Sequence, residues 1–214
     1  LGTWGDIGCF SFEEKKCMTT GDGGMICSND IDLIEPLKPY RWVGIDKDTW
    51  KRVQAAEGSQ ENEAMHWHYE ISVLGYKYNM NDIMAAIGLV QLEKLDQMNE
   101  RRRKSFARYI DGIKDIPEIS LYLPYTTNGD EAYWFFGIRI KDRDNLIIYL
   151  KSKGIATGVH FYPLTLQPLF KQYNVNCDVA NSIWEEFLTL PSYADLSEEE
   201  IDYVIGVLKN FMES

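Results

Sequence analysis

The sequence predicts an α/β fold, in which β-strands and α-helices alternate along the chain. Three observations lead to this prediction: apolar residues alternate near the start, a long middle segment keeps helical spacing, and short strand and helix patterns follow one another after Pro117. The 214 residues, of which 45% are hydrophobic and 13% aromatic, are enough to bury one core and a fraction of a second.

Two strands are predicted at the start of the chain, at residues 9–12 and from Gly23 onward, and we expect the first to lie in the middle of a sheet. Lys15 and Lys16 lie in the connection between them, followed by threonines and glycines. A lysine held on such a scaffold can form a Schiff base with a carbonyl cofactor such as pyridoxal phosphate, and Lys16 is our candidate. The same pattern is also typical of an ordinary hairpin with solvated lysines.

Residues 31–74 predict an irregular stretch. Within it, residues 55–64 are acidic and poor in bulky apolar side chains, which is typical of a mobile surface loop. His66 and His68 would share one face of a strand, but no third ligand lies near them in sequence. We therefore expect no metal site.

A long helix is predicted from Asp82, which can cap it, to about Ile113. Its small residues Ala85, Ala86 and Gly88 permit close packing against another element. The basic run at residues 101–104 is interpreted as a solvated face of this helix.

Strand and helix patterns alternate in the second half of the chain. They predict a strand at 133–141, a helix capped by Asp144, a strand at 156–162, a helix at 179–190 and a last helix opened by a capping box of Ser197 and Glu200. This order indicates a layered sheet with helices packed against it.

The net charge of −11 argues against a nucleic-acid partner, because a polyanion is bound by a basic surface. No apolar stretch is long enough to span a bilayer, and the start of the sequence lacks the pattern of a signal peptide. The four cysteines form no CxxC motif, so we expect reduced thiols. Together these observations predict a cytoplasmic protein that binds neither nucleic acid nor membrane.

The start of the chain, GDIGCFSFEEKKCMTTGDGGMICSND, resembles the internal-lysine segment of the DegT/DnrJ/EryC1/StrS family, the pyridoxal-phosphate-dependent sugar aminotransferases. The family carries its imine lysine four residues after the last Phe of this strand. The resemblance therefore implies that Lys16 is the catalytic lysine and that Ser11 contacts the cofactor phosphate. Asp22 stands where the commoner residue is Glu.

Three further segments resemble family signatures, at residues 74–95, 158–168 and 188–205. In the first, the resemblance implies that Asn79 reaches the phosphate of the neighbouring subunit's cofactor and that Tyr76 contacts the substrate. In the second, it implies a substrate contact for His160. Thr165 stands where the family usually has a second His, which places the sugar-side contacts in question.

The resemblance implies a type I fold of pyridoxal-phosphate-dependent transferases, similar to aspartate aminotransferase. Residues 1–100 would be the end of the large cofactor-binding domain and residues 101–214 the small C-terminal domain. Relatives place the phosphate loop, the ring-stacking aromatic and the Asp that pairs with the pyridine nitrogen upstream of the segment that begins at Gly5. We therefore expect this chain to be roughly the C-terminal half of a longer enzyme.

The implied reaction moves an amino group from glutamate to a 4-keto nucleotide sugar, in a homodimer with shared active sites, for surface glycan synthesis. Two alternatives stay open. The chain could be a catalytically inactive lobe that serves dimerisation or interaction, or a relative similar to the sugar dehydratases. Those relatives carry His at the lysine position, so Lys16 favours transamination.

Overall fold

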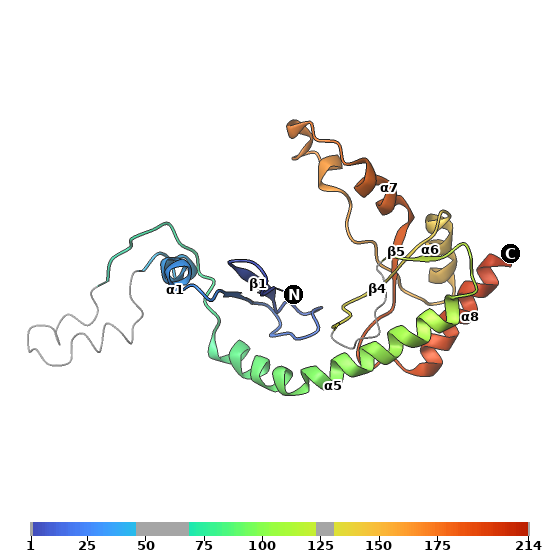
Figure 1. Ribbon diagram of the computed structural model, residues 1–214, viewed down its shortest axis with the longest axis horizontal. Helices are drawn as coiled ribbons and strands as arrows, with labels where there is room; N and C mark the ends of the chain where they lie inside the picture. The colour runs from blue at the N-terminus through green and yellow to red at the C-terminus, as the bar shows by residue number, and fades with distance from the viewer. Residues whose placement is uncertain (1, 46–68, 123–130, 214) are drawn as a thin grey trace, which may run out of the picture. The chain divides into compact units, whose positions relative to one another are not determined.

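The structure is a computed structural model that describes residues 2–45, 69–122 and 131–213 (Figure 1). It divides into two compact units, Leu1–Glu93 and Lys94–Ser214, and the division falls within the long helix α5. Helices and strands alternate along the chain, as the α/β prediction requires. The predicted acidic loop and the pair His66 and His68 lie outside the described residues.

The N-terminal unit begins with a two-stranded antiparallel hairpin. Strand β1 (Gly8–Ser11) pairs with β2 (Gly24–Cys27), in a register that places Gly8 opposite Cys27 and Ser11 opposite Gly24. Both strands were predicted; the expected position of the first in the middle of a sheet stays a prediction, since β2 is the one strand paired with it in the part of the chain described. A hairpin needs only the short connection that the sequence provides.

Part of the stretch predicted to be irregular is helical. It forms three short consecutive turns of helix, which are α1 (Ile31–Ile34), η1 (Glu35–Leu37) and α2 (Lys38–Arg41). Asp30 caps the first by accepting a hydrogen bond from the amide of Asp32 at 2.9 Å. Such short turns escape a periodicity analysis, which needs more residues than they contain.

Helix α5 (Asp82–Ile113) has the predicted span. Its cap differs, because the amide of Met84 donates to the side chain of Asn81 at 3.0 Å, which makes Asn81 rather than Asp82 the capping residue. The predicted close packing is present at Gly88, where a Cβ would lie 2.9 Å from Thr20 of the hairpin loop.

The prediction of a solvated basic face on α5 is wrong for Arg102, which is only 8% exposed. Its guanidinium lies 3.5 Å from the carbonyl oxygens of Trp134 and Ser192. The neighbouring Arg101 and Arg103 do form surface ion pairs, with Asp195 and Glu100 respectively. Four consecutive helix residues point in different directions, so one of them must face the core side.

The C-terminal unit is built on a three-stranded antiparallel sheet in the order β3–β4–β5. Its strands are β3 (Ser120–Leu121), β4 (Phe136–Arg139) and β5 (Phe187–Leu190). Phe136 lies opposite Leu190 and Ile138 opposite Leu188, so these four side chains share one face of the sheet. They form the core with side chains of α5, α6 (Arg143–Ser152) and α8 (Glu198–Met212), which lie beside the strands in Figure 1.

Two predicted boundaries in this unit are wrong. The helix expected at 179–190 is α7 (Asp178–Glu186) followed directly by β5. The strand expected at 156–162 is reduced to one bridge between Gly158 and Thr189, and the short turns η2 (Leu164–Leu166) and η3 (Lys171–Tyr173) follow it.

The helix ends of this unit test the predicted caps. Helix α6 begins after Asp142 rather than at a cap formed by Asp144, whose carboxylate accepts from Arg143 at 2.8 Å. The predicted capping box of α8 is confirmed, since the Ser197 side chain accepts from Glu200 and the Glu200 side chain accepts from Ser197. None of the helices in the described residues is long and apolar enough to cross a membrane.

Candidate functional site

The loop between β1 and β2 is closed by hydrogen bonds at Phe12. The carbonyl oxygen of Phe12 accepts from the amide of Thr20 at 2.9 Å and from the hydroxyl of Thr19 at 3.1 Å, while its amide donates to Gly23 at 2.9 Å. Residues 13–18 therefore form a loop whose two ends are fixed to one residue. A side chain on this loop is held on a defined support.

Lys16 lies in this closed loop. Its amide donates to the carbonyl of Glu13 at 3.0 Å, and its Nζ lies 3.9 Å from Oε2 of Glu13. The same carboxylate oxygen accepts from the amide of Lys15 at 3.1 Å, which fixes it beside the amine. The Lys16 side chain is 28% exposed, so the amine is partly shielded and accessible. Sequence reasoning missed Glu13, whose spacing of three residues from Lys16 was the available signal.

Ser11 ends β1 and lies on the same hairpin as Lys16. It is exposed, and its hydroxyl oxygen lies 3.4 Å from the amide of Glu13. The carboxylate of Asp22 accepts from the amide of Gly23 at 2.8 Å and so stabilises the turn. Gly23 has a φ of +133°, and a Cβ there would lie 2.9 Å from the Thr20 hydroxyl, so this turn requires glycine.

The segment before α5, which carries Asn79, contacts the hairpin through Met80. A Cβ on Gly23 would lie 3.3 Å from the side chain of Met80, the next residue after Asn79. The side-chain oxygen of Asn79 is buried and makes no hydrogen bond to any residue that the structure describes. This oxygen retains the capacity to accept a hydrogen bond, while the NH2 group of the same amide is the part that can donate to an anion.

Tyr76 lies on the same segment, and its backbone pairs with the end of α2. Its amide donates to Tyr40 at 2.8 Å, and its carbonyl accepts from Val43 at 2.9 Å. The Tyr76 ring stacks on Tyr78 at 5.1 Å and 15°, while Lys77, between them, lies 3.4 Å from the centre of the Trp42 ring. Tyr76 is 53% exposed, so one face of a rigidly held aromatic pair is open.

His160 belongs to the C-terminal unit and lines a cavity of about 760 Å³. Its ring stacks on Phe135 at 5.8 Å and 21°, and it meets the edge of Phe161 at 4.9 Å. The other residues that line the cavity are Tyr122, Phe161, Pro163, Cys177, Asp178, Val179, Ala180, Ile183, Trp184 and Phe187. The cavity is therefore mostly apolar with few polar groups, as small-molecule sites usually are.

Trp184 forms a wall of this cavity and is held from two sides. The Arg143 guanidinium lies 4.8 Å from the centre of its ring and also donates to its carbonyl oxygen, while Tyr162 meets it edge-on at 5.0 Å. Sequence reasoning missed this wall because its members come from α6, α7 and the segment after His160, which are distant in sequence.

The sequence and the structure of this chain are similar to those of known proteins, and the similarity shows the family to which the chain belongs. The sequence profile of the DegT/DnrJ/EryC1/StrS aminotransferase family matches residues 1–209. The chain belongs to this family. The DegT/DnrJ/EryC1/StrS resemblance seen in the sequence is thereby confirmed.

Relatives and solved structures agree with this membership. The spore coat polysaccharide biosynthesis protein SpsC of Bacillus subtilis is 32% identical over 100% of this chain and 55% of its own length. The putative sugar aminotransferase Spr1654 of Streptococcus pneumoniae, in its PMP form, superimposes with a TM-score of 0.84 at 29% identity, over 99% of this chain and 54% of its own. The aminotransferase TlmJ of Streptoalloteichus hindustanus gives a TM-score of 0.83 at 28% identity, over 99% and 53%. The predicted fold, the C-terminal portion of a type I transferase, is confirmed, and the chain spans about half the length of these relatives.

In a DegT/DnrJ/EryC1/StrS protein, pyridoxal phosphate requires an amine for its aldehyde and hydrogen-bond donors for its phosphate. The N-terminal unit offers a primary amine on a fixed loop at Lys16, a hydroxyl on the same hairpin at Ser11 and a side-chain amide at Asn79, whose NH2 group can donate. These are the donor types that an aldehyde and a phosphate require. The residues present fit the group. Within the described residues no three His, Cys, Asp or Glu side chains gather as metal ligands do.

Proposed function

We propose that this chain carries the internal lysine of a cytoplasmic, pyridoxal-phosphate-dependent aminotransferase that moves an amino group from glutamate to a 4-keto nucleotide sugar. The observation that carries the proposal is Lys16, which lies partly shielded on a loop closed at Phe12 in a chain of the DegT/DnrJ/EryC1/StrS aminotransferase family. Relatives named for sugar aminotransfer and spore coat polysaccharide synthesis support a sugar substrate.

Lys16 has two roles in this proposal. Its amine would hold the cofactor through the aldehyde, and the same amine, when free, would hold and move the proton at the substrate carbon. When bound, pyridoxal phosphate supplies the electron sink that makes this carbon acidic. Glu13, 3.9 Å from Nζ, is placed to keep the amine directed along the loop.

Ser11 and Asn79 bind the cofactor phosphate in the proposal, Ser11 in its own subunit and Asn79 in the neighbouring subunit of a homodimer. Both side chains can donate a hydrogen bond to an anion. Tyr76 and His160 orient the sugar substrate. An exposed face of the Tyr76–Tyr78 pair and the cavity at His160 support this assignment.

We assign residues 1–100 to the end of the large cofactor-binding domain and residues 101–214 to the small domain. The chain spans about half the length of its relatives, so we further propose that the remainder of the active site comes from the portion that lies outside this chain. That portion would hold the partner of the pyridine nitrogen.

A trapping experiment tests the central role of Lys16. The protein is mixed with pyridoxal phosphate and reduced with borohydride, and the modified peptide is located by mass spectrometry. We expect the added mass on Lys16 and its loss in Lys16→Ala, while the matched neighbour variant Lys15→Ala is still labelled. Equal labelling of Lys15 and Lys16 would contradict the proposal, since it indicates unselective surface amines.

The reaction itself is tested with the complete protein that contains this chain. Incubation with a 4-keto nucleotide sugar and glutamate should release 2-oxoglutarate, whereas a dehydratase-like relative would change the sugar without it. Mixing Lys16→Ala and Asn79→Ala chains should restore part of the activity if Asn79 serves the neighbouring subunit. Absence of any recovery in the mixture argues for unshared sites.

One observation favours a second candidate, an interaction lobe. In the described residues of the N-terminal unit, large apolar side chains of α5 such as Ile83, Leu89 and Leu92 are exposed. Faces of this kind mark surfaces that another polypeptide covers. Borohydride trapping separates the candidates, because an inactive lobe would leave Lys16 unlabelled.

A further inference from the structure

We propose that Gly158 is a positioning residue that sets the direction of the His160 imidazole in the C-terminal cavity. The inference rests on the proposed substrate role of His160 and deepens it. Because Gly158, two residues before His160, has no side chain, the imidazole ring can occupy the space beside it. Hydrogen bonds to Thr189 on β5 hold Gly158 in place.

The backbone of Gly158 is fixed to β5 by three hydrogen bonds to one residue. The Gly158 amide donates to the carbonyl of Thr189 at 3.1 Å, and the Gly158 carbonyl accepts from the Thr189 amide at 2.7 Å and from its hydroxyl at 3.2 Å. Thr189 is buried in the strand. These bonds restrain Gly158, so it cannot easily shift to make room for a side chain.

The position of Gly158 has no room for a side chain. A Cβ on Gly158 would lie 2.8 Å from the Thr189 hydroxyl and 2.9 Å from Cε1 of His160. Both distances are shorter than real Cβ contacts, so one of the two neighbours would have to shift. The φ angle of Gly158 lies outside the left-handed region, so the φ angle alone does not require glycine here. Glycine is required here because the imidazole ring fills the space that a side chain would need.

The His160 ring is held in this position by aromatic neighbours. It stacks on Phe135 at 5.8 Å and 21°, lies 6.0 Å from Trp134 and meets Phe161 edge-on at 4.9 Å. Phe135 is itself packed against Phe187 at 6.0 Å, on the sheet face opposite the hydrophobic core. The ring therefore sits between a glycine on one side and an aromatic stack on the other, and it lines the cavity.

The position of the His160 ring decides whether its nitrogen can reach a substrate group. An imidazole that orients a sugar hydroxyl or a phosphate must present a ring nitrogen at hydrogen-bond distance, so a displaced ring weakens binding of that group. A methyl group on Gly158 displaces the ring without removing it. The variant Gly158→Ala thus separates the direction of His160 from its presence.

The experiment compares the His160 ring signal with stability in a matched set of variants. The chain is labelled with histidine carrying ¹³C at Cε1; it has three histidines, and His160→Gln identifies the signal of His160. Gly158→Ala should shift that signal and lower the melting temperature. The double variant Gly158→Ala/Thr189→Ala should recover much of the melting temperature, because the clash with the hydroxyl is gone, yet keep the shifted signal.

Two control variants complete the set. Gly206→Ala, at a helix position where a Cβ meets nothing within 4 Å, should leave the signal unchanged. Thr189→Ala alone should change the signal far less than Gly158→Ala, since the two backbone bonds to Gly158 remain and no contact of the imidazole is removed. An unshifted His160 signal in Gly158→Ala overturns the inference, and so does a shift in Thr189→Ala as large as that in Gly158→Ala.

The KM of the complete protein separates this inference from the proposed function. With His160 misdirected in Gly158→Ala, we expect the KM for the keto sugar to rise about tenfold or more, with a smaller change in kcat. A shifted ring signal with an unchanged KM supports the positioning by Gly158 and overturns the substrate role of His160.

Discussion

At the scale of single residues, the loop that carries Lys16 depends on two glycines with different requirements. Gly21 and Gly23 both have positive φ angles, +84° and +133°. A Cβ on Gly21 meets nothing within 4 Å, whereas one on Gly23 meets the Thr20 hydroxyl at 2.9 Å. The first position therefore excludes most residues by conformation alone, and the second by conformation and space together.

This difference leads to a prediction for the loop. Gly21→Asn should retain capture of pyridoxal phosphate by Lys16, because Asn tolerates the left-handed region. Gly23→Ala should reduce capture several-fold and destabilise the loop by about 1 to 3 kcal/mol. Borohydride trapping at increasing cofactor concentration measures the effect, and equal capture by both variants would contradict the assigned role of Gly23.

Tyr109 permits a second prediction at this scale. Its side chain is fully buried in the core, and its hydroxyl donates to the carbonyl of Pro191 at 3.0 Å. Burial raises the pKa of the Tyr109 phenol well above its usual value, and the neighbouring Tyr193 adds to this effect. As pH rises past the unfolded value of about 10, the unfolded chain releases this proton before the folded chain does.

The stabilising contribution of Tyr109 is therefore complete below about pH 10 and decreases above it, by up to about 1.4 kcal/mol per pH unit. Tyr109→Phe should cost about 1 kcal/mol at pH 8 through the lost hydrogen bond and should weaken the alkaline decrease in unfolding free energy. Urea unfolding at pH 8 and pH 11 gives both values. Parallel decreases in the wild type and the variant would show that Tyr109 ionises equally in both states.

At the scale of elements, boundaries set by strong periodicity were predicted correctly, whereas boundaries set by packing were not. The span of α5 and the capping box of α8 followed from spacing alone, because each reflects interactions between residues three or four apart. The boundary between α7 and β5 did not. All four residues of β5 are buried, so the strand reads as a continuous apolar run that periodicity cannot separate from a buried helix.

The strand expected at residues 156–162 failed for a related reason. Its alternation is real, but the structure pairs it with β5 only between Gly158 and Thr189. Beyond that bridge the segment contributes His160 and Phe161 to an aromatic cluster and does not continue the strand pairing. Lys16 and Ser11 on the hairpin could be named from the sequence, whereas Arg143 and Trp184 became visible only through tertiary contacts. Glu13 makes a local contact three residues from Lys16, which the sequence analysis did not use.

The cap of α8 gives a prediction at this scale. Ser197 and Glu200 satisfy each other's backbone amides, at 3.2 Å and 2.9 Å. Ser197→Ala should destabilise the C-terminal unit by about 1 kcal/mol, and Ser197→Asp should retain most of the stability because aspartate also accepts at this position. Chemical denaturation followed by circular dichroism distinguishes the two, and equal losses in both would argue against a capping role.

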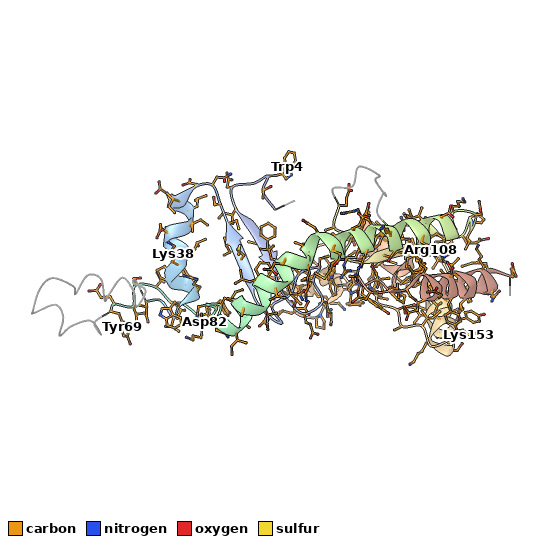
Figure 2. All side chains as sticks on the ribbon, turned by 90° about the horizontal axis from the view of Figure 1, so that it is seen from below. Trp4, Lys38, Tyr69, Asp82, Arg108 and Lys153 are labelled. Atoms are coloured by element: carbon orange, nitrogen blue, oxygen red, sulfur yellow. The ribbon has the colours of Figure 1, made fainter. Side chains whose placement is uncertain are left out.

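At the scale of the whole molecule, the two units differ in how their apolar residues are buried. In the C-terminal unit, core residues from α5, the sheet, α6 and α8 form one continuous cluster. Among the described residues of the N-terminal unit, only Gly8, Thr20, Gly44 and Gly88 are buried. Trp4 is 90% exposed and stands clear of the backbone in Figure 2. The hairpin is held chiefly by hydrogen bonds and turn geometry.

This contrast agrees with the length relation to the relatives. A chain that spans about half of each matched protein has surfaces in one unit that the remaining half or a second subunit can cover. Ile83 and Leu89 on α5 are 76% and 66% exposed and so offer apolar surface that another polypeptide can cover. The hairpin residues of the candidate site, Lys16 and Ser11, therefore lie on the unit with fewer buried residues, and we expect their order to depend on what binds there.

Hydrogen exchange on the intact chain tests this view. We expect slow exchange for amides of β4, β5, α8 and the part of α5 that includes Phe106 and Tyr109, because opening them exposes the core. The amides of β1 and β2 should exchange orders of magnitude faster, since a two-stranded hairpin has little stability of its own. Addition of pyridoxal phosphate should slow exchange around Lys16 more than in α8, as binding stabilises the unit that carries the ligand. Protection of β1 equal to that of β4 in the isolated chain would mean that the N-terminal unit is stabilised by contacts beyond those described, and the dependence on a partner would then be wrong.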